Sequence, residues 1–224
     1  MIASNNNISQ AVTSKEVTNR LLDAAENLFA EKGFDGTSIR EITSQAKCNL
    51  AAVNYHFGGK EKLYSEVFRR RMIAMRDVRI AGIEEVMSQT DHEPTLEELI
   101  RGFATAFIEP LIDQSSGRRF MKLMVREMSD PRLPRKMFVE ELAAPTLSAL
   151  GKAMSKLYPG LDQRKIVLSI MSIVGQLVQV IRLNEMFDLE DFVGAPAPTL
   201  AEMVDHIVEF STAGIQAMVE EEGR

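Results

Sequence analysis

The sequence predicts an all-α protein, and its composition and apolar spacing both favour helices packed on helices. The chain has 224 residues, of which 45% are hydrophobic, with 13 Met and no Trp. Long segments repeat apolar residues at i, i+3, i+4 and i+7, which is the period of an amphipathic helix. This length is sufficient for two small domains with a sizeable core.

The first helix is expected to begin at Thr13, where Thr13 and Glu16 have the spacing of a capping box, and to end at Gly33. Residues 1–12 contain three consecutive Asn and lack the charge and apolar core of a signal peptide, so we expect a flexible arm. The helix carries an apolar stripe of Val17, Leu21, Ala25, Leu28 and Phe29.

Residues 38–60 predict two short helices joined by a tight turn. Ser38 and Glu41 form a second capping-box pattern, and Asn49 is a suitable cap for the following helix. Ile39, Ile42 and Ala46 share one face of the first of these helices, and Leu50, Val53 and Phe57 are expected to face inward from the second.

The outward face of the second short helix predicts a contact surface. It lacks Lys and Glu, and consists of Ala51, Ala52, Asn54, Tyr55 and His56. Small residues allow a helix to enter the DNA major groove, and Asn can bond adenine or phosphate. Lys60, at the start of the next helix, opposes the helix dipole unless an anion such as phosphate lies beside it. The pattern fits a helix-turn-helix, and an ordinary helical hairpin is the alternative.

Three segments resemble the N-terminal domain of TetR/AcrR-type transcriptional regulators: residues 22–38 (LDAAENLFAEKGFDGTS), 39–42 (IREI) and 53–61 (VNYHFGGKE). The similarity covers about residues 13 to 72. Residues 126–131 (REMSDP) and 138–141 (FVEE), with Pro145, are similar to the C-terminal domain of the CecR-like branch.

The resemblance implies a helical dimer that binds an operator with its N-terminal domains and a small ligand with its C-terminal domains. The sequence departs from the family at Lys47, where Gly is frequent, and at Asn54, where Tyr is common. The candidate DNA contacts are Thr37, Ser38, Arg40, Lys47, Asn49, Ala51, Ala52, Asn54, Tyr55, His56 and Lys60.

The charge distribution agrees with DNA binding by the N-terminal part. The whole chain has a formal charge of −6, but residues 13–76 contain eleven Lys and Arg against eight Asp and Glu. We therefore expect a DNA-binding domain at residues 13–76 and a second domain at residues 77–224. The one cysteine, Cys48, fits a reducing cytoplasm. It is interpreted as a small buried side chain, with a redox switch as the alternative.

A long connecting helix is expected from Glu61 to Met87. Its early arginines, residues 69–71, either face DNA or form a solvated basic face. The next helix is expected from Thr95 to Ile112, with Pro110 ending or kinking it, and a further helix from Pro134 to Tyr158 is expected to kink near Pro145.

A ligand pocket is expected in the second domain, because flexible Met side chains adapt to varied ligands. Arg126 and Glu127 are interpreted as a buried pair or as ligand-orienting groups. The candidate ligand-binding residues are Phe103, Phe107, Met121, Met124, Met128 and Gln176, and the ligand is expected to be apolar or amphipathic.

The helix after Asp162 is apolar on all sides, which predicts that a second subunit covers it. With the last helix, from Thr199 to Met218, it would form a four-helix bundle in a homodimer. Gln176 and Gln179 would lie in either the interface or the pocket. His206 is expected at the rim of the interface rather than as a metal ligand.

The sequence argues against an enzyme, a metal site or a bound cofactor. It has no Gly-rich phosphate loop and no paired Cys ligands, and none of its three His lies at helical metal spacing from another. The apolar run from Ile166 to Ile181 is shorter than a bilayer span and carries polar residues. The remaining interpretations are a ligand-responsive DNA-binding regulator, expected to be a repressor, and a helical protein–protein adaptor.

Overall fold

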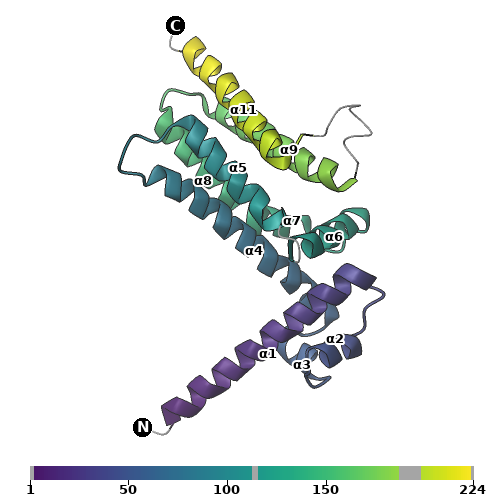
Figure 1. Cartoon of the computed structure of the whole chain (residues 1–224). Helices are drawn as coiled ribbons and strands as arrows, with labels where there is room; N and C mark the ends of the chain where they lie inside the picture. Colours follow the sequence, from purple (N-terminus) through teal and green to yellow (C-terminus); the bar gives the residue numbers. More distant parts are fainter. Residues whose placement is uncertain (1–2, 113–115, 187–197, 223–224) are drawn as a thin grey trace. The chain divides into compact units, whose positions relative to one another are not determined.

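The structure is a computed structural model that describes residues 3–112, 116–186 and 198–222, which form helices and no strand (Figure 1). The helices are α1 (Ala3–Lys32), α2 (Ile39–Gln45), α3 (Ala52–Phe57), α4 (Lys60–Met87), α5 (Leu96–Ile112), α6 (Ser116–Ser129), α7 (Arg135–Phe138), the π-helix η1 (Val139–Ala143), α8 (Ala144–Leu157), α9 (Gln163–Met186) and α11 (Leu200–Glu222). The all-α prediction is confirmed.

The chain divides into two compact units. The first contains Met1–Met72 with Asp113–Met137, and the second contains Ile73–Ile112 with Phe138–Arg224. This division and the boundary expected after residue 76 both fall within α4. In the structure, however, α6 belongs to the first unit, whereas the sequence places it in the C-terminal domain.

The core of the first unit is built from α1, α2, α3 and the first part of α4. Fully buried side chains come from each of these helices, and α1 also packs on α6. The helix expected to start at Thr13 begins at Ala3 instead, so the structure continues α1 through the residues expected to form an arm. The central buried residues of this core are Leu21, Ala25, Phe29, Ile42, Val53, Leu63, Val67 and Phe68.

The second unit is a bundle in which α5 packs against α8, α9 and α11. Capping boxes start two of its helices. Thr95 Oγ1 accepts from the N–H of Glu98 at 3.2 Å, and Thr199 Oγ1 accepts from the N–H of Glu202 at 3.2 Å. As expected, Asp162 caps α9, because its Oδ1 accepts from the N–H of Arg164 at 2.8 Å.

Pro145 changes the helix type rather than ending the helix. It has no N–H to donate to the carbonyl four residues earlier, and the turn just before it is the π-helix η1. Pro110 also lies inside a helix, since α5 continues to Ile112.

Candidate nucleic-acid interface

The capping box predicted at the start of α2 is present. Glu41 Oε2 accepts from the N–H and the hydroxyl of Ser38 at 2.9 and 2.7 Å, and Ser38 Oγ accepts from the N–H of Glu41 at 3.2 Å. Lys32 Nζ donates to Glu41 Oε1 at 2.6 Å. The hydrogen bonds from Lys32 and then from Ser38 lower the pKa of Glu41 to about 2. Glu41 is therefore ionised at neutral pH and fixes the start of α2.

The turn between α2 and α3 is made without glycine. Lys47 has a φ of +52°, a left-handed conformation that costs an ordinary residue about 1–2 kcal/mol. The N–H of Cys48 donates to the carbonyl of Thr43 at 2.8 Å and closes the turn. Asn49 Oδ1 then accepts from the N–H of Ala51 at 2.9 Å, which orients the chain into α3.

Replacing Lys47 with Gly is expected to stabilise the protein by about 1 kcal/mol, because Gly adopts positive φ without a steric penalty. The substitution is also expected to make the plot of log affinity against log salt concentration less steep, by the amount that corresponds to about one phosphate contact. The reason is that Lys47 is exposed beside α3. Urea unfolding and fluorescence anisotropy at several salt concentrations measure the two effects. The Lys47→Ala variant is the control: it should show the same DNA effect without the gain in stability. A Gly variant less stable than the parent would contradict the prediction.

The outward face of α3 is largely uncovered by the described chain. Tyr55 is 83% exposed, and Ala51 and Asn54 are also exposed, while Val53 is fully buried on the opposite face. Ala52 is half-buried. So is His56, whose Nδ1 lies 3.3 Å from Thr18 Oγ1 on α1.

The inward position expected for Leu50 is wrong, because this side chain is 56% exposed. The reason is that α3 begins at Ala52, so Leu50 lies in the preceding turn rather than on the buried stripe of the helix. Leu50 therefore joins the exposed surface around Ala51 and Tyr55.

Thr37 was predicted to contact DNA, but this prediction is wrong, because Thr37 does not belong to the exposed surface. Its side chain is buried, and its hydroxyl donates to the carbonyls of Leu28 at 3.1 Å and Gly33 at 2.8 Å. Thr37 instead ties the end of α1 to the start of α2. Ser38 and Arg40, its neighbours among the candidates, are exposed.

Lys60 is the first residue of α4 and is half-buried. Gly58 and Gly59, with φ of +76° and +134°, make the sharp turn that leads into this helix. The Lys60 ammonium lies 4.2 Å from the centroid of the Phe34 ring. The first N–H groups of α4 have no intrahelical acceptor, so a helix start with a lysine at this place can bind a phosphate.

The arginines at residues 69–71 hold α4 against α1, or pair within α4, rather than forming a free basic face. Arg70 donates to Glu26 Oε2 at 2.8 Å and to Asp23 Oδ1 at 2.7 Å, and Arg71 Nε donates to Glu26 Oε1 at 3.0 Å. Arg69 pairs with Glu66. Glu26 is only 1% exposed. Glu26 was not among the predicted residues, although its spacing from Leu22 and Phe29 puts it on the buried stripe of α1.

Arg126 and Glu127 bind different partners, so the expected buried pair is wrong. Glu127 accepts from the Tyr64 hydroxyl at 3.0 Å and from the backbone N–H groups of Arg132 and Leu133 at 2.8 and 2.7 Å. Arg126 is exposed and donates to the carbonyl of Glu31 at 3.0 Å. These bonds attach α6 and the segment after it to α1 and α4 of the same unit.

The six candidate ligand-binding residues are not collected in one cavity of either unit. Phe103 and Phe107 are buried in α5 of the second unit, with ring centroids 5.8 Å apart. Met121, Met124 and Met128 lie on α6 of the first unit, and Met128 is exposed rather than pocket-lining there.

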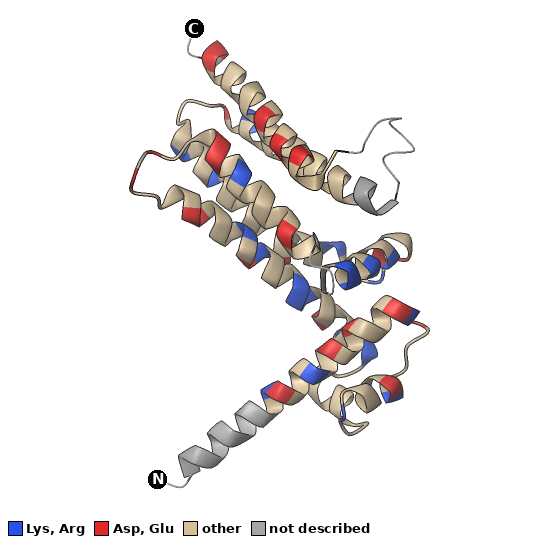
Figure 2. Cartoon of the chain, in the orientation of Figure 1, with Lys and Arg blue, Asp and Glu red and all other residues tan. Residues whose placement is uncertain are grey.

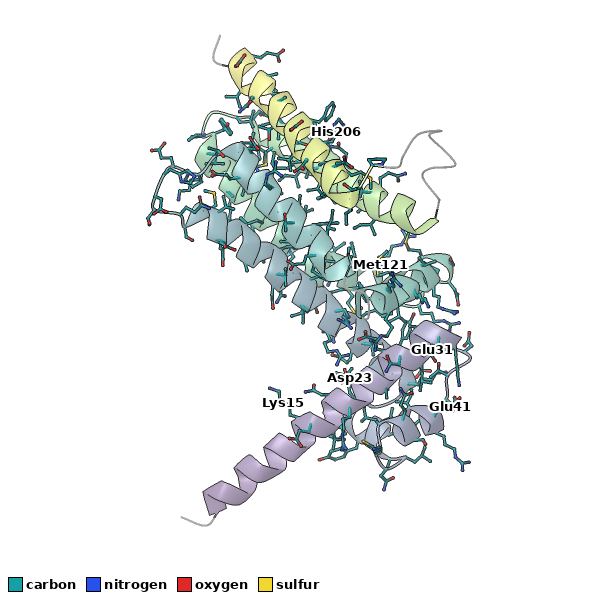
Figure 3. The ribbon with its side chains drawn as sticks, in the orientation of Figure 1. Lys15, Asp23, Glu31, Glu41, Met121 and His206 are labelled. Atoms are coloured by element: carbon teal, nitrogen blue, oxygen red, sulfur yellow. The ribbon has the colours of Figure 1, made fainter. Side chains whose placement is uncertain are left out.

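Gln176 lines an open groove between α9 and α11 of the second unit. The groove has a volume of about 730 Å³. Gln176 Nε2 donates to the carbonyl of Ser172 at 3.3 Å and to Ser211 Oγ at 3.4 Å. His206, which is labelled on α11 in Figure 3, also lines the groove. The other residues that line this groove include Met171, Gly175, Gln179, Met203, Ile207 and Phe210.

The faces of α9 and α11 around the groove are apolar and exposed. Leu168, Met171 and Phe210 each expose more than 60% of their surface, while Ile170 and Ile173 of α9 face the core. Gln163–Ile181 is long and apolar enough to cross a membrane by length and composition, with 39% of it buried inside the protein. In Figure 2, the described part of α11 carries Asp and Glu and no Lys or Arg. Among the described residues, no group of three or more His, Cys, Asp or Glu could hold a metal ion.

This arrangement is that of a helical protein with an N-terminal helix-turn-helix. Two family models match the chain: "Bacterial regulatory proteins, tetR family" over residues 21–67, and "Tetracyclin repressor-like, C-terminal domain" over residues 103–214. The chain belongs to the TetR family of bacterial regulatory proteins. It is a DNA-binding transcriptional regulator and not an enzyme.

Named relatives agree with this class. The chain is 43% identical over 114 residues to the probable HTH-type transcriptional regulator YttP of Bacillus subtilis, a match that spans 49% of each protein. It is 25% identical over 180 residues to the HTH-type transcriptional dual regulator CecR of Shigella flexneri, covering 77% of this chain and 79% of CecR. These names favour DNA binding and give no support to the protein–protein adaptor.

Solved structures show the same fold. A TetR-family transcriptional regulator from Mesorhizobium loti matches with a TM-score of 0.68 at 21% identity, covering 91% of this chain and 96% of that one. A transcriptional regulator from Pseudomonas aeruginosa PAO1 matches with a TM-score of 0.67 at 17% identity, covering 89% and 90%.

Proposed function

We propose that this protein is a homodimeric cytoplasmic repressor that a small molecule releases from its operator. The observation that supports operator binding is the face of α3, where Ala51, Asn54 and Tyr55 are exposed and Val53 is fully buried on the opposite side. Together with the neighbouring Leu50, which is 56% exposed, Tyr55 forms an uncovered apolar surface of the kind that marks an interaction site. Ser38 and Arg40 at the start of α2, and Lys47 and Asn49 in the turn before α3, are also exposed and supply phosphate contacts.

Dimerisation is part of this proposal because α3 is short. A helix of six residues reaches few base pairs, so useful specificity needs two half-sites, with the recognition helices about 34–36 Å apart. The apolar faces of α9 and α11 supply the interface: they are exposed in the single chain and would be buried when two copies form a four-helix bundle.

The ligand response is inferred from the family and requires only a modest coupling. A ligand that favours one separation of the recognition helices by about 1–3 kcal/mol lowers operator affinity 5- to 150-fold. We propose that the second unit, with Phe103 and Phe107 in its core, binds this ligand.

Tyr55→Ala is expected to weaken operator binding by about 30-fold, because each of the two half-sites loses a contact of about 1 kcal/mol. The variant should remain folded and dimeric, since Tyr55 packs on little of its own chain. Fluorescence anisotropy with duplex DNA from the protein's own locus, at fixed salt, measures the affinity. Tyr55→Phe is the matched control and separates the hydroxyl group from the ring.

An unchanged binding isotherm for Tyr55→Ala would remove Tyr55 from the interface. If the parent protein bound no duplex from its locus in a salt-dependent manner, the repressor proposal itself would be wrong, and the face of α3 would be left for a protein partner.

A further inference from the structure

Arg79 is a buried cation on the apolar face of α4. The residues before and after it at helical spacing, Met75, Ile83 and Val86, are all buried, so Arg79 occupies a core position. It keeps only 5% of its surface exposed. Arg76, one turn earlier, is only partly buried and pairs with Asp77.

The structure gives Arg79 an aromatic neighbour but no anion. Its guanidinium carbon lies 3.7 Å from the centroid of the Phe107 ring on α5. Its Nε is buried and has no hydrogen-bond partner, and no ion pair to Arg79 occurs among residues 3–112, 116–186 and 198–222. Both Arg79 and Phe107 belong to the second unit.

The bonding of Arg79 is incomplete, because its buried positive charge has no anionic partner among the described residues. Burial lowers the pKa of Arg79 to about 10, so the side chain is still protonated at neutral pH. Stacking on Phe107 satisfies one face of the guanidinium plane, but its N–H donors point outward within the plane and bind acceptors there. Buried charges are otherwise paired with an opposite charge, because leaving them unpaired is costly.

We propose that Arg79 binds the anionic group of the effector, and that the effector is a carboxylate carried on an apolar or aromatic body. This inference rests on the proposed ligand response of the second unit. A carboxylate matches the planar edge of a guanidinium and would satisfy the unpartnered Nε together with one terminal nitrogen. The side chains around Arg79, namely Phe107, Met75 and Ile83, are apolar and suit an apolar body.

Close packing beside this position keeps the guanidinium and the ring in place. Gly82 on α4 and Gly102 on α5 allow the two backbones to approach. A Cβ at Gly82 would lie 2.9 Å from the Ala106 Cβ, and one at Gly102 would lie 2.8 Å from Val86 Cγ2. These contacts are about one turn from Arg79 and Phe107, so α4 and α5 are closely packed beside the guanidinium group and the ring. A preorganised cation of this kind binds an anion without paying for its own ordering.

The test compares carboxylates with amides of the same shape. Benzoate, 4-phenylbutyrate and octanoate, and the corresponding amides, are added to the full-length protein at constant ionic strength, and thermal unfolding is followed. At least one carboxylate is expected to raise the Tm of the parent by roughly 3 °C or more, beyond the effect of its amide. The preference should disappear in Arg79→Gln and remain in Arg76→Gln, the matched control on the same helix.

Equal shifts for every carboxylate and its amide, or a carboxylate preference that survives in Arg79→Gln, would overturn the proposal. Arg79→Met provides a second measurement that needs no ligand. If the cation has no partner in the free protein, this variant should melt at the same temperature as the parent or higher. A large decrease in Tm would show that a chain carboxylate pairs with Arg79.

Operator binding separates this inference from the proposed function. The effective carboxylate should reduce binding of the parent to its operator and have no effect on Arg79→Gln. If the parent binds no operator while the carboxylate preference is present, the site is established and the repressor assignment fails. If operator binding is normal and the preference is absent, only the Arg79 site is wrong.

Discussion

Replacing Glu26 with Ala is expected to lower the free energy of unfolding by about 3 kcal/mol, which corresponds to a decrease in Tm of roughly 6–12 °C. Glu26 is buried and accepts from both Arg70 and Arg71, so its removal takes a buried acceptor away from each of the two guanidinium groups. The estimate lies at the lower end for a broken buried pair, because the side chains of Arg70 and Arg71 are 31% and 26% exposed and can turn towards water.

The structure offers a matched control on the same helix. Asp23, on α1 (Figure 3), also pairs with Arg70, at 2.7 Å, but its side chain is 66% exposed. Exposed ion pairs contribute about 0–1 kcal/mol, so Asp23→Ala should change the Tm only slightly. Urea unfolding of both variants gives the comparison. If Glu26→Ala and Asp23→Ala were equally stable, the buried carboxylate would not be what holds α4 against α1.

Glu26 is also expected to affect DNA binding, although its side chain is buried and makes no contact with DNA itself. The bonds from Arg70 and Arg71 to Glu26 fix α4 against α1, and the buried Val53 of α3 packs in the same core. A loosened core allows α3 to adopt several orientations, of which few fit the major groove. Glu26→Ala is therefore expected to weaken operator binding even at temperatures where the protein remains folded, and circular dichroism at the binding temperature checks that condition.

Local interactions were predictable from the sequence. The box between Ser38 and Glu41 and the cap at Asp162 involve residues two or three positions apart, so residue type and spacing are sufficient to predict them. The turn at Lys47 was also predictable as a turn made without glycine. The exposure of Ala51, Asn54 and Tyr55 follows from the single buried stripe of a short helix.

Features that depend on distant parts of the chain were not predictable. Glu127 bonds Tyr64, and Glu26 bonds Arg70, across 63 and 44 positions. Nothing in the local pattern indicates these partners. A two-residue shift in the start of α3 was enough to move Leu50 from the expected core to the surface. The carbonyls of Leu28 and Gly33 bind the Thr37 hydroxyl, which lies among exposed neighbours in the sequence.

The buried position of Arg79, in contrast, could have been predicted from the sequence. Met72, Met75, Ile83 and Val86 continue the buried stripe of α4, and their spacing places Arg79 on it. A charge on such a stripe indicates either a distant partner or a ligand, and the choice between these requires the structure. The predicted pocket residues Phe103 and Phe107 lie on the helix that supplies the ring under this cation.

Met171→Glu is expected to convert the protein to monomers and to weaken operator binding by at least 100-fold. Met171 lines the groove between α9 and α11 and exposes 62% of its surface, so a Glu there is solvated in the single chain. In a four-helix bundle of two copies the same carboxylate would be buried twice without a partner, which costs several kcal/mol. Light scattering coupled to size exclusion measures the mass of the variant.

The loss of affinity follows from the geometry of the half-sites. A monomer presents one α3, so it binds one half-site and loses the contribution of the second. A loss of more than 100-fold in affinity corresponds to more than 2.7 kcal/mol.

Lys152→Glu is the control. It changes an exposed charge on α8, outside the residues that line the groove, so this variant should remain dimeric with nearly parental affinity. Because Met171 is exposed, the Tm of the Met171→Glu monomer at low concentration should match that of the parent diluted below its dimer dissociation constant. A dimeric Met171→Glu with parental affinity would show that α9 and α11 do not form the interface, and the exposed apolar groove would then require a different occupant.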